Sequence, residues 1–354
     1  MTGRIVVTGA DGYLGRRIAA RLLVETGDRL VLTVRAADRR ELAAREAALR
    51  RELVAGPGRV EVVAADLSRP EPLSGVDPAG VTGVVHAAAR TRPGAGRPEV
   101  EAVNVFGALR VAEFARACPQ LERVVVLSTL PGSRWGDPHG WSRREAERQL
   151  LDAHADLPLT IARLPAVVAD DETGAVGRYH GFHLALRLYF HGLLPLLPGE
   201  PAARQYLTTA DIAARGVAHL ATSNPPAGPL AGVVHLTPPP AWTLTVAEVF
   251  NVAAAAFAGD PAFRHRPPRR PHLPDGRRRR VDTNGGRLRR AWPGYPGLDP
   301  RRLVTATCHR LAASWLAARS GQRPELVGGP GAGPDLDLGA GRRGGARVVQ
   351  ALAG

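Results

Sequence analysis

Residues 4–15 read RIVVTGADGYLG. The first five are rich in β-branched side chains and predict a strand, and apolar residues recur at helical spacing after the last glycine. Between them, Gly9 permits a tight turn, Gly12 lets the backbone approach a pyrophosphate, and Gly15 lets the helix pack close to the sheet. Amides at a helix N-terminus attract phosphate, so the stretch predicts a dinucleotide site. Its predicted lining residues are Gly9, Asp11, Gly12, Tyr13, Leu14 and Gly15.

The end of the second predicted strand, residues 30–34, indicates which dinucleotide is bound. A site for NAD usually places an acidic residue there, on the ribose hydroxyls. This chain has Arg35 at that position, with Arg39 and Arg40 close behind it. A guanidinium matches a phosphate group with two parallel hydrogen bonds. The sequence therefore predicts that the cofactor is NADP(H).

Strand-like and helix-like segments alternate along the first half of the chain, which is typical of a parallel sheet covered by helices. Further strands are predicted at residues 60–64, 83–86, 124–127 and 161–168, and helices at 39–54, 103–117 and 142–155. We therefore expect an α/β fold in which residues 1–168 form a Rossmann-type, doubly wound parallel sheet that binds NADP.

The second half of the chain is predicted to be a smaller, mostly helical substrate-binding region, residues 169–320. Helices are expected at residues 179–192, 211–221, 244–258 and 303–317, and a strand at 232–236. Segments between about 205 and 236 are expected to return to the Rossmann sheet. Residues 321–354 are rich in Gly, Pro and Arg, and we expect them to form a flexible tail.

The composition narrows the classes of function. A net charge of +14 over 354 residues would suit nucleic-acid binding, but every one of the 47 basic residues is an arginine. Together with the abundance of Ala, Gly and Pro, this indicates a GC-rich genome, so we expect no nucleic-acid partner. Without lysine, no catalytic step can use an ammonium group or a Schiff base.

The small number of cysteines, and the lack of a leader, a membrane span and a metal-binding motif, indicate the cellular compartment and argue against metal chemistry. Cys118 and Cys308 are too few for a disulfide framework, which fits a reducing compartment. The first strand starts at Arg4 without a leader, and no apolar run reaches the roughly 18 residues of a membrane span. We therefore expect a cytoplasmic protein without a membrane partner. No metal site is expected, because the histidines of residues 180–191 have no carboxylate or Cys at ligand spacing.

Taken together, these motifs resemble the extended branch of the short-chain dehydrogenase/reductase superfamily, which includes the NAD(P)-dependent epimerases and dehydratases. The resemblance covers roughly residues 5–258. It implies an adenine-contacting pair after the third strand, a segment beside the cofactor after the fourth, an Asn-Val-x-Gly helix and an Arg-x-Pro segment near the nicotinamide. The cofactor-binding residues that it adds are Asp66, Leu67, Ala87, Ala88, Ala89, Asn104, Leu164 and Pro165.

The catalytic positions depart from the pattern of that superfamily. There, a Tyr gives or takes a proton, and a Lys four residues later holds the nicotinamide ribose and lowers the Tyr pKa. Ser142 and Glu147 fit the pattern and set the register, which places His139 at the Tyr position and Arg143 at the Lys position. The usual pair is therefore absent. Arg143 is expected to keep the ribose contact.

Three residues are candidates for the remaining catalytic roles. Ser128 and Thr129 close the fifth predicted strand and are expected to hydrogen-bond a substrate carbonyl, unless they only cap the strand. His139 is the candidate proton donor, because an imidazole titrates near neutral pH. A solvent-exposed loop residue is the alternative interpretation of His139.

Three functions are compatible with this site. The first is an atypical NADPH-dependent ketoreductase that reduces a ketone on an angucyclinone-like aromatic polyketide, similar to the tyrosine-less ketoreductases of actinomycete antibiotic pathways. The second is a non-catalytic NADP(H)-binding sensor or scaffold, and the third is a sugar-type epimerase or dehydratase. We favour the first, because hydride transfer depends mainly on proximity and orientation. The short loop at residues 130–138 weighs against the third.

Overall fold

A computed structural model of the chain describes residues 3–56, 58–92, 94–130, 138–223, 232–268, 292 and 295–319. The chain divides into two compact units. The first holds the described residues of Met1–Leu164, Asp211–Leu236 and Asn284–Tyr295, and the second those of Pro165–Ala210, Thr237–Thr283 and Pro296–Gly354. The expected tail at 321–354 lies outside the described residues.

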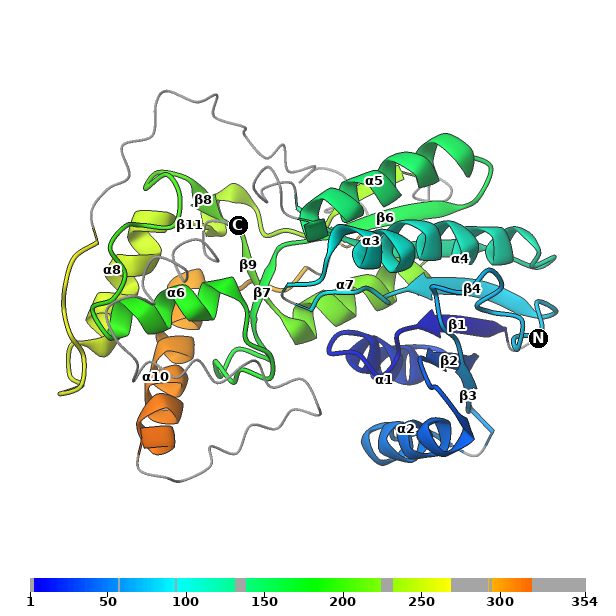
Figure 1. The fold of residues 1–354 in the computed structure, drawn as a ribbon, viewed down its shortest axis with the longest axis horizontal. Coiled ribbons are helices and arrows are strands. Elements are labelled where there is room, and N and C mark those ends of the chain that lie inside the picture. Colours follow the sequence, from blue (N-terminus) through cyan, green and yellow to red (C-terminus); the bar gives the residue numbers. More distant parts are fainter. Residues whose placement is uncertain are drawn as a thin grey trace. The chain divides into compact units, whose positions relative to one another are not determined.

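The first unit is built on a seven-stranded parallel sheet (Figure 1). The strand order is β10-β6-β5-β4-β1-β2-β3, so the direction of winding reverses beside β1. The strands are β1 (Arg4–Thr8), β2 (Arg29–Val34), β3 (Val60–Ala64), β4 (Val81–His86), β5 (Arg123–Thr129), β6 (Leu159–Leu164) and β10 (Gly232–His235). The predicted Rossmann-type, doubly wound sheet is confirmed.

Helices cover both faces of this sheet. They are α1 (Gly15–Glu25), α2 (Arg39–Glu52), α3 (Arg97–Val100), α4 (Gly107–Arg116), α5 (Pro138–Ala153) and α7 (Ala210–Thr222). Figure 1 shows α1 and α2 on one face of the sheet and α4 and α5 on the other. The β-branched residues of the strands form the core between the layers, including Val6, Val84, Val124, Val126 and Ile161.

Two predicted elements of the first unit are wrong in detail. The predicted α-helix at residues 103–117 is preceded by α3 and includes a π-helical turn, Glu101–Phe106, before α4 begins. The predicted strand at residues 161–168 is two strands, because Pro165 has no N–H to donate to a ladder. It ends β6 at Leu164, and the chain continues as β7 (Ala166–Ala169) in a different sheet.

The second unit is mostly helical, with α6 (Gly181–Phe190), α8 (Val246–Phe257) and α10 (Pro300–Arg319). Its core is aromatic: the ring of Phe190 lies 5.0 Å from that of Phe257 and 5.4 Å from that of Trp315, centroid to centroid. Two short strand pairs complete it. β7 pairs in parallel with β9 (Leu207–Thr209), and β8 (Arg204–Gln205) pairs antiparallel with β11 (Leu244–Thr245).

The segment between residues 205 and 236 divides between these sheets. β10 joins the seven-stranded sheet beside β6, whereas β9 pairs with β7 in the second unit. The predicted helix at residues 244–258 starts two residues later, at Val246, because Leu244 and Thr245 form β11. Thr245 caps α8 and Glu248 completes a capping box, a Thr-x-x-Glu signal that the sequence already contained.

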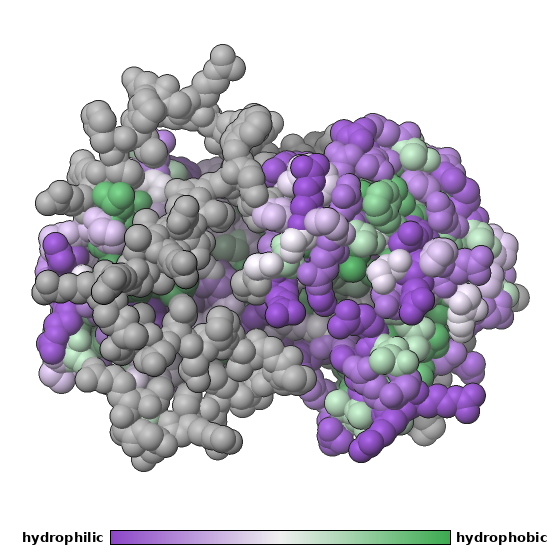
Figure 2. Space-filling view, in the orientation of Figure 1, coloured by the Kyte–Doolittle hydropathy of each residue, from purple (hydrophilic) through white to green (hydrophobic). Residues whose placement is uncertain are grey.

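The surface of the first unit is mostly polar on the face that Figure 2 shows. Figure 2 shows hydrophilic residues over most of the visible face of the first unit, interrupted by small apolar areas. Within the described ranges, no helix combines the length and apolar character that crossing a bilayer requires.

Candidate cofactor and active site

The glycine loop after β1 has little room for side chains. Gly9 has a positive φ of 65°, and a Cβ there would lie 2.7 Å from the Cα of Ala88. A Cβ on Gly15, the first residue of α1, would collide with the carbonyl of Gly9. Both positions therefore require glycine on steric grounds. The loop brings α1 close under the carboxyl end of β1, the geometry in which a helix N-terminus meets a pyrophosphate.

Side chains of the glycine loop are held by neighbouring arginines. Asp11 forms an ion pair with Arg45 of α2, whose guanidinium also pairs with Glu41 at 2.6 Å. The guanidinium of Arg17 lies 4.4 Å from the centre of the Tyr13 ring. The sequence predicted only a helix over residues 39–54 and did not identify Arg45 as a partner of the loop. The pair fixes the loop against α2.

Three arginines gather beyond the carboxyl end of β2. Asp38 accepts a hydrogen bond from the Glu41 amide and caps α2, which places Arg39 and Arg40 in the first turn, close to Arg35. All three arginines are exposed, and within the described part of the chain none of them forms an ion pair. The charge of Arg35 acts on two nearby carboxyls, Glu41 and Asp66, and helps to lower the pKa of each.

Asp66 and Leu67 follow β3. Burial opposes ionisation of Asp66, but hydrogen bonds from Ser68 and the charge of Arg35 lower its pKa below the usual value. Leu67 packs under α4, where a Cβ on Gly107 would come within 2.9 Å of the Leu67 Cβ. The close approach explains the glycine in the Asn-Val-x-Gly helix.

The residues after β4 are tied to β1 by a buried polar contact. The hydroxyl of Thr8 lies 2.8 Å from His86 Nδ1 and accepts a hydrogen bond from the Ala88 amide at 3.3 Å. Burial, and the charge of Arg143, lower the pKa of His86 to about 3, so this imidazole is neutral. The contact orients the segment Ala87, Ala88 and Ala89 along the sheet edge.

Asn104, inside the π-helical turn, connects that segment to the start of α5. Its Oδ1 accepts from the Arg90 amide at 2.7 Å, and its Nδ2 donates to the Arg90 carbonyl and, at 3.0 Å, to Ser142 Oγ. Ser142 in turn donates to the His139 carbonyl. Asn104, predicted to bind the cofactor, therefore also positions the helix that carries the catalytic candidates.

The two residues in the Tyr and Lys positions make backbone contacts. His139 Nε2 lies 3.1 Å from the Arg92 carbonyl oxygen. Arg143 donates to the Leu127 carbonyl of β5, and desolvation lowers the pKa of its guanidinium to about 10, which leaves it charged at neutral pH. Arg143 thus anchors α5 to β5.

The two hydroxyl candidates at the end of β5 have different surroundings. Ser128 is buried and donates to Glu147, which also binds the guanidinium of Arg163 through both carboxylate oxygens. Thr129 is exposed. Leu164 and Pro165 lie at the end of β6, where the Leu164 carbonyl accepts from the Leu130 amide. The sequence singled out Glu147 and Arg163 separately, but not their pairing.

Most of the predicted residues therefore lie at one edge of the sheet. Each follows or ends a parallel strand at its carboxyl end, where ligands of doubly wound folds bind. A cavity of about 10 Å³, room for about one water, lies beneath them. It is lined in part by His86, Asn104, Ser128, Arg143 and Glu147. Within the described residues, no cluster of His, Cys, Asp or Glu is arranged to hold a metal ion.

This fold and sheet edge define a dinucleotide-binding protein of the Rossmann type. The chain belongs to the NAD-binding family described as male sterility protein, which it matches over residues 7–134 and 131–217. A search of curated proteins gave no match.

Solved structures with the same fold include reductase domains and epimerases. The terminal R domain of the myxalamid PKS-NRPS pathway is 19% identical with a TM-score of 0.64, and the match covers 91% of this chain and 92% of that one. The Bordetella bronchiseptica enzyme WbmF in complex with NAD+ is 14% identical with a TM-score of 0.61, and the match covers 90% of this chain and 95% of that one. The epimerase Mth375 of Methanothermobacter thermautotrophicus is 17% identical with a TM-score of 0.61, and the match covers 91% of this chain and 96% of that one.

Proposed function

We propose that this protein is an NADPH-dependent reductase that converts a ketone on an aromatic polyketide to an alcohol without a Tyr–Lys pair. The observation that carries the proposal is the contrast at the sheet edge. The cofactor positions are occupied as in the superfamily, whereas positions 139 and 143 hold an imidazole and a guanidinium. A site that keeps the dinucleotide but lacks the strong acid–base pair suits hydride transfer to a well-oriented carbonyl.

The arginine patch after β2 supports NADPH as the cofactor. Arg35, Arg39 and Arg40 are exposed and form no ion pair in the described ranges, and their guanidinium groups suit a 2′-phosphate, which they can hold with two parallel hydrogen bonds. When bound, the nicotinamide supplies the hydride.

The end of β5 supports a role in orienting the substrate. Ser128 is buried and committed to Glu147, so Thr129 is the hydroxyl that can donate to the carbonyl oxygen. Hydride goes to the carbonyl carbon and a proton to the oxygen, which gives the alcohol. His139 is the candidate source of the proton, with water or an acidic group of the substrate as the alternatives.

The test is a turnover assay with purified protein, NADPH or NADH, and a panel of aromatic polyketide ketones, measuring loss of reduced cofactor and the alcohol formed. Two further substrates extend the panel. A phosphopantetheine thioester is included because two structural neighbours are described as reductase domains of peptide and polyketide synthetases. UDP-glucuronic acid is included because another neighbour is its 4-epimerase.

The outcomes separate the three functions. Reduction of a ketone with preference for NADPH supports the proposal. Tight NADPH binding without turnover of any substrate overturns it in favour of a sensor or scaffold. Isomerisation of the sugar nucleotide without net consumption of reduced cofactor overturns it in favour of an epimerase.

The role of His139 needs a separate measurement. In His139→Phe, the rate and its dependence on pH are compared with those of the wild-type protein. The matched control is His265→Phe, an exposed histidine of the second unit. If His139→Phe lowers the rate and an added weak acid restores it, His139 is the proton donor. An unchanged rate and pH profile would assign the proton to water or substrate.

A further inference from the structure

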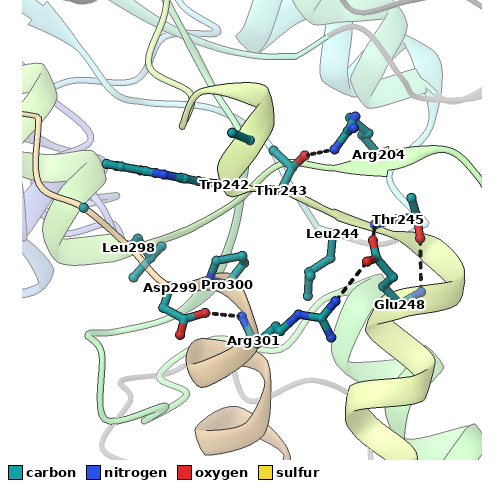
Figure 3. Close-up of a pocket in the computed structure, with 12 residues that line it drawn as sticks. Arg204, Trp242, Thr243, Leu244, Thr245, Glu248, Leu298, Asp299, Pro300 and Arg301 are labelled. Atoms are coloured by element: carbon teal, nitrogen blue, oxygen red, sulfur yellow. Dashed lines mark hydrogen bonds and ion pairs between the residues drawn. The ribbon is translucent and has the colours of Figure 1, made fainter.

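The second unit contains a pocket whose lining includes none of the residues named for the proposed reduction. It is an open cavity of about 860 Å³, within the range of pockets that hold small organic molecules. Figure 3 shows its walls, which come from β8, from the segment leading into α8, and from the segment leading into α10. All of the lining residues belong to the second unit.

One part of the pocket is apolar and flat. Trp242 is 42% exposed, a large value for an indole, and its six-membered ring rests near Gly297, where a Cβ would come within 3.4 Å. Leu244 lines the pocket from β11, and Leu298 and Pro300 line it from the segment that leads into α10 (Figure 3). An exposed indole next to aliphatic side chains favours a flat ring system, because aromatic rings gain both burial and offset stacking there.

The carboxylates of the pocket are already paired. Glu248 accepts from Arg301 at 2.9 Å and from the Thr245 amide, and the hydrogen bond from Thr245 holds its pKa below the usual value. Asp299 accepts from the amides of Arg301 and Arg302 and caps α10. Glu248 therefore has its counter-charge in Arg301, and Asp299 is engaged by backbone amides at the start of α10. The capped helix N-termini are not available to an anion.

Arg204 also lines the pocket, and its charge is one of the causes that lower the pKa of Glu248. One of its terminal nitrogens, Nη1, donates to the Pro240 carbonyl and to Thr243 Oγ1, both at 3.0 Å, and both acceptors are neutral. Within the described part of the chain Arg204 forms no ion pair with a carboxylate, and in Figure 3 it lies beside Thr243, with Trp242 on the other side of that residue. The remaining N–H groups of the guanidinium suit a planar carboxylate.

We propose that this pocket binds a planar aromatic carboxylate, with its rings against Trp242 and its carboxylate on Arg204. The proposal rests on none of the residues named for the dinucleotide site or for the proposed reduction. The side chains of the second unit alone, chiefly Trp242 and Arg204, indicate aromatic carboxylates as its class of ligand.

The experiment is isothermal titration of the full chain with 2-naphthoate and with its neutral counterpart 2-naphthamide. We expect 2-naphthoate to bind at least about tenfold more tightly, because only the carboxylate can form charge-assisted hydrogen bonds with Arg204. Arg204→Gln should weaken 2-naphthoate about tenfold and leave 2-naphthamide unchanged. The control Arg264→Gln removes an exposed arginine of the same unit that also bonds a backbone carbonyl, and should change neither.

Trp242 provides the second, independent arm. Trp242→Ala should weaken both probes about tenfold, whereas Trp242→Phe retains most of the affinity. NADPH affinity and the unfolding midpoint serve as folding controls for every variant. The proposal is overturned if 2-naphthoate does not bind, if both probes bind equally well to the wild-type protein, or if Arg204→Gln keeps the preference for the carboxylate.

Discussion

The hydroxyl of Ser128 donates a hydrogen bond to Glu147, a carboxylate that also holds the guanidinium of Arg163. This relationship joins the ends of β5 and β6 to the middle of α5. Ser128, one of the two hydroxyl residues expected to bind substrate, is therefore buried and holds Glu147 in place. Its neighbour Thr129 is exposed.

Removing the carboxylate of Glu147 should destabilise the first unit. Glu147→Ala leaves the partly buried guanidinium of Arg163 without its counter-charge, and we expect a loss of about 3 kcal/mol in the free energy of unfolding. Glu145→Ala on the same helix is the control: its partner Arg148 is 59% exposed, so the loss should stay below about 1 kcal/mol. Urea unfolding at pH 7 measures both, and equal losses would contradict the assignment.

The two hydroxyls at the end of β5 should respond differently to removal. Thr129→Val should lower kcat/KM for carbonyl reduction about a hundredfold, the usual effect of losing one donor to a developing oxyanion, without changing NADPH affinity. Ser128→Ala should lower the free energy of unfolding by about 1–2 kcal/mol, because the Glu147 oxygen loses a donor. Steady-state kinetics and urea unfolding of both variants test this prediction. If Ser128→Ala lowers kcat/KM and Thr129→Val lowers only stability, Ser128 is the substrate-binding residue.

Cofactor preference should depend on Arg35. Arg35→Asp replaces the guanidinium with a carboxylate that repels a 2′-phosphate, so NADPH should bind more than about tenfold more weakly while NADH is little affected. Arg51→Asp, at the exposed end of α2, makes the same change of charge away from β2. Fluorescence titration with both dinucleotides tests this, and a parallel loss of NADPH and NADH would refute it.

The glycine loop should not tolerate a methyl group. Gly9→Ala combines a positive φ with a Cβ placed 2.7 Å from the Ala88 backbone, and we expect NADPH affinity to fall by more than about tenfold along with stability. Gly96 has a φ of −69°, and its Cβ would meet only Pro98 Cδ at 3.8 Å, so Gly96→Ala is the matched control. Nucleotide affinity and thermal unfolding of both variants test the prediction, and an unaffected Gly9→Ala would show that the loop adapts.

Burial of His86 should make stability sensitive to acid. Its pKa is about 3 in the folded protein and about 6.5 in an unfolded chain, so between these values the unfolded state binds the extra proton. The contribution is therefore complete above pH 6.5 and declines by about 1.4 kcal/mol per pH unit as the pH falls. In His86→Asn, the loss of stability between pH 6.5 and pH 5 should be about 2 kcal/mol smaller than in the wild-type protein.

The measurement is urea unfolding at both pH values. His265→Asn, which removes an exposed histidine, should leave the dependence on pH unchanged. If His86→Asn shows the wild-type decline, other groups are responsible for it.

The sequence predicted the large sheet well, because its strands are short β-branched runs separated by glycines and amphipathic helices. It failed where a single residue changes the hydrogen bonding. Pro165 ends β6 and redirects the chain into a second sheet, although the apolar run continues through it. Periodicity records which residues are apolar, and it does not record a missing N–H.

The polar contacts of the site were harder to predict than its position. Gly9, Arg35 and Ser128 share an edge because parallel strands end together. Asp11 pairs with Arg45, which is 34 residues away along the chain, and Glu147 pairs with Arg163, which is 16 residues away. Residues so far apart have no local spacing pattern that would predict either pair. The Trp242 and Arg204 pocket depends likewise on residues that only the folded second unit assembles.

The π-helical turn at Glu101–Phe106 has a consequence for protein engineering. A wide turn of this kind holds one residue more than an α-helical turn. Deleting one residue just before Asn104 would restore ordinary helical spacing, but it would also change the place of Asn104 within the turn and the direction of its side chain. The shortened helix would be more regular, and Arg90 and Ser142 would lose the side chain that connects them. Regularising this turn is therefore a change that a stabilisation campaign should avoid.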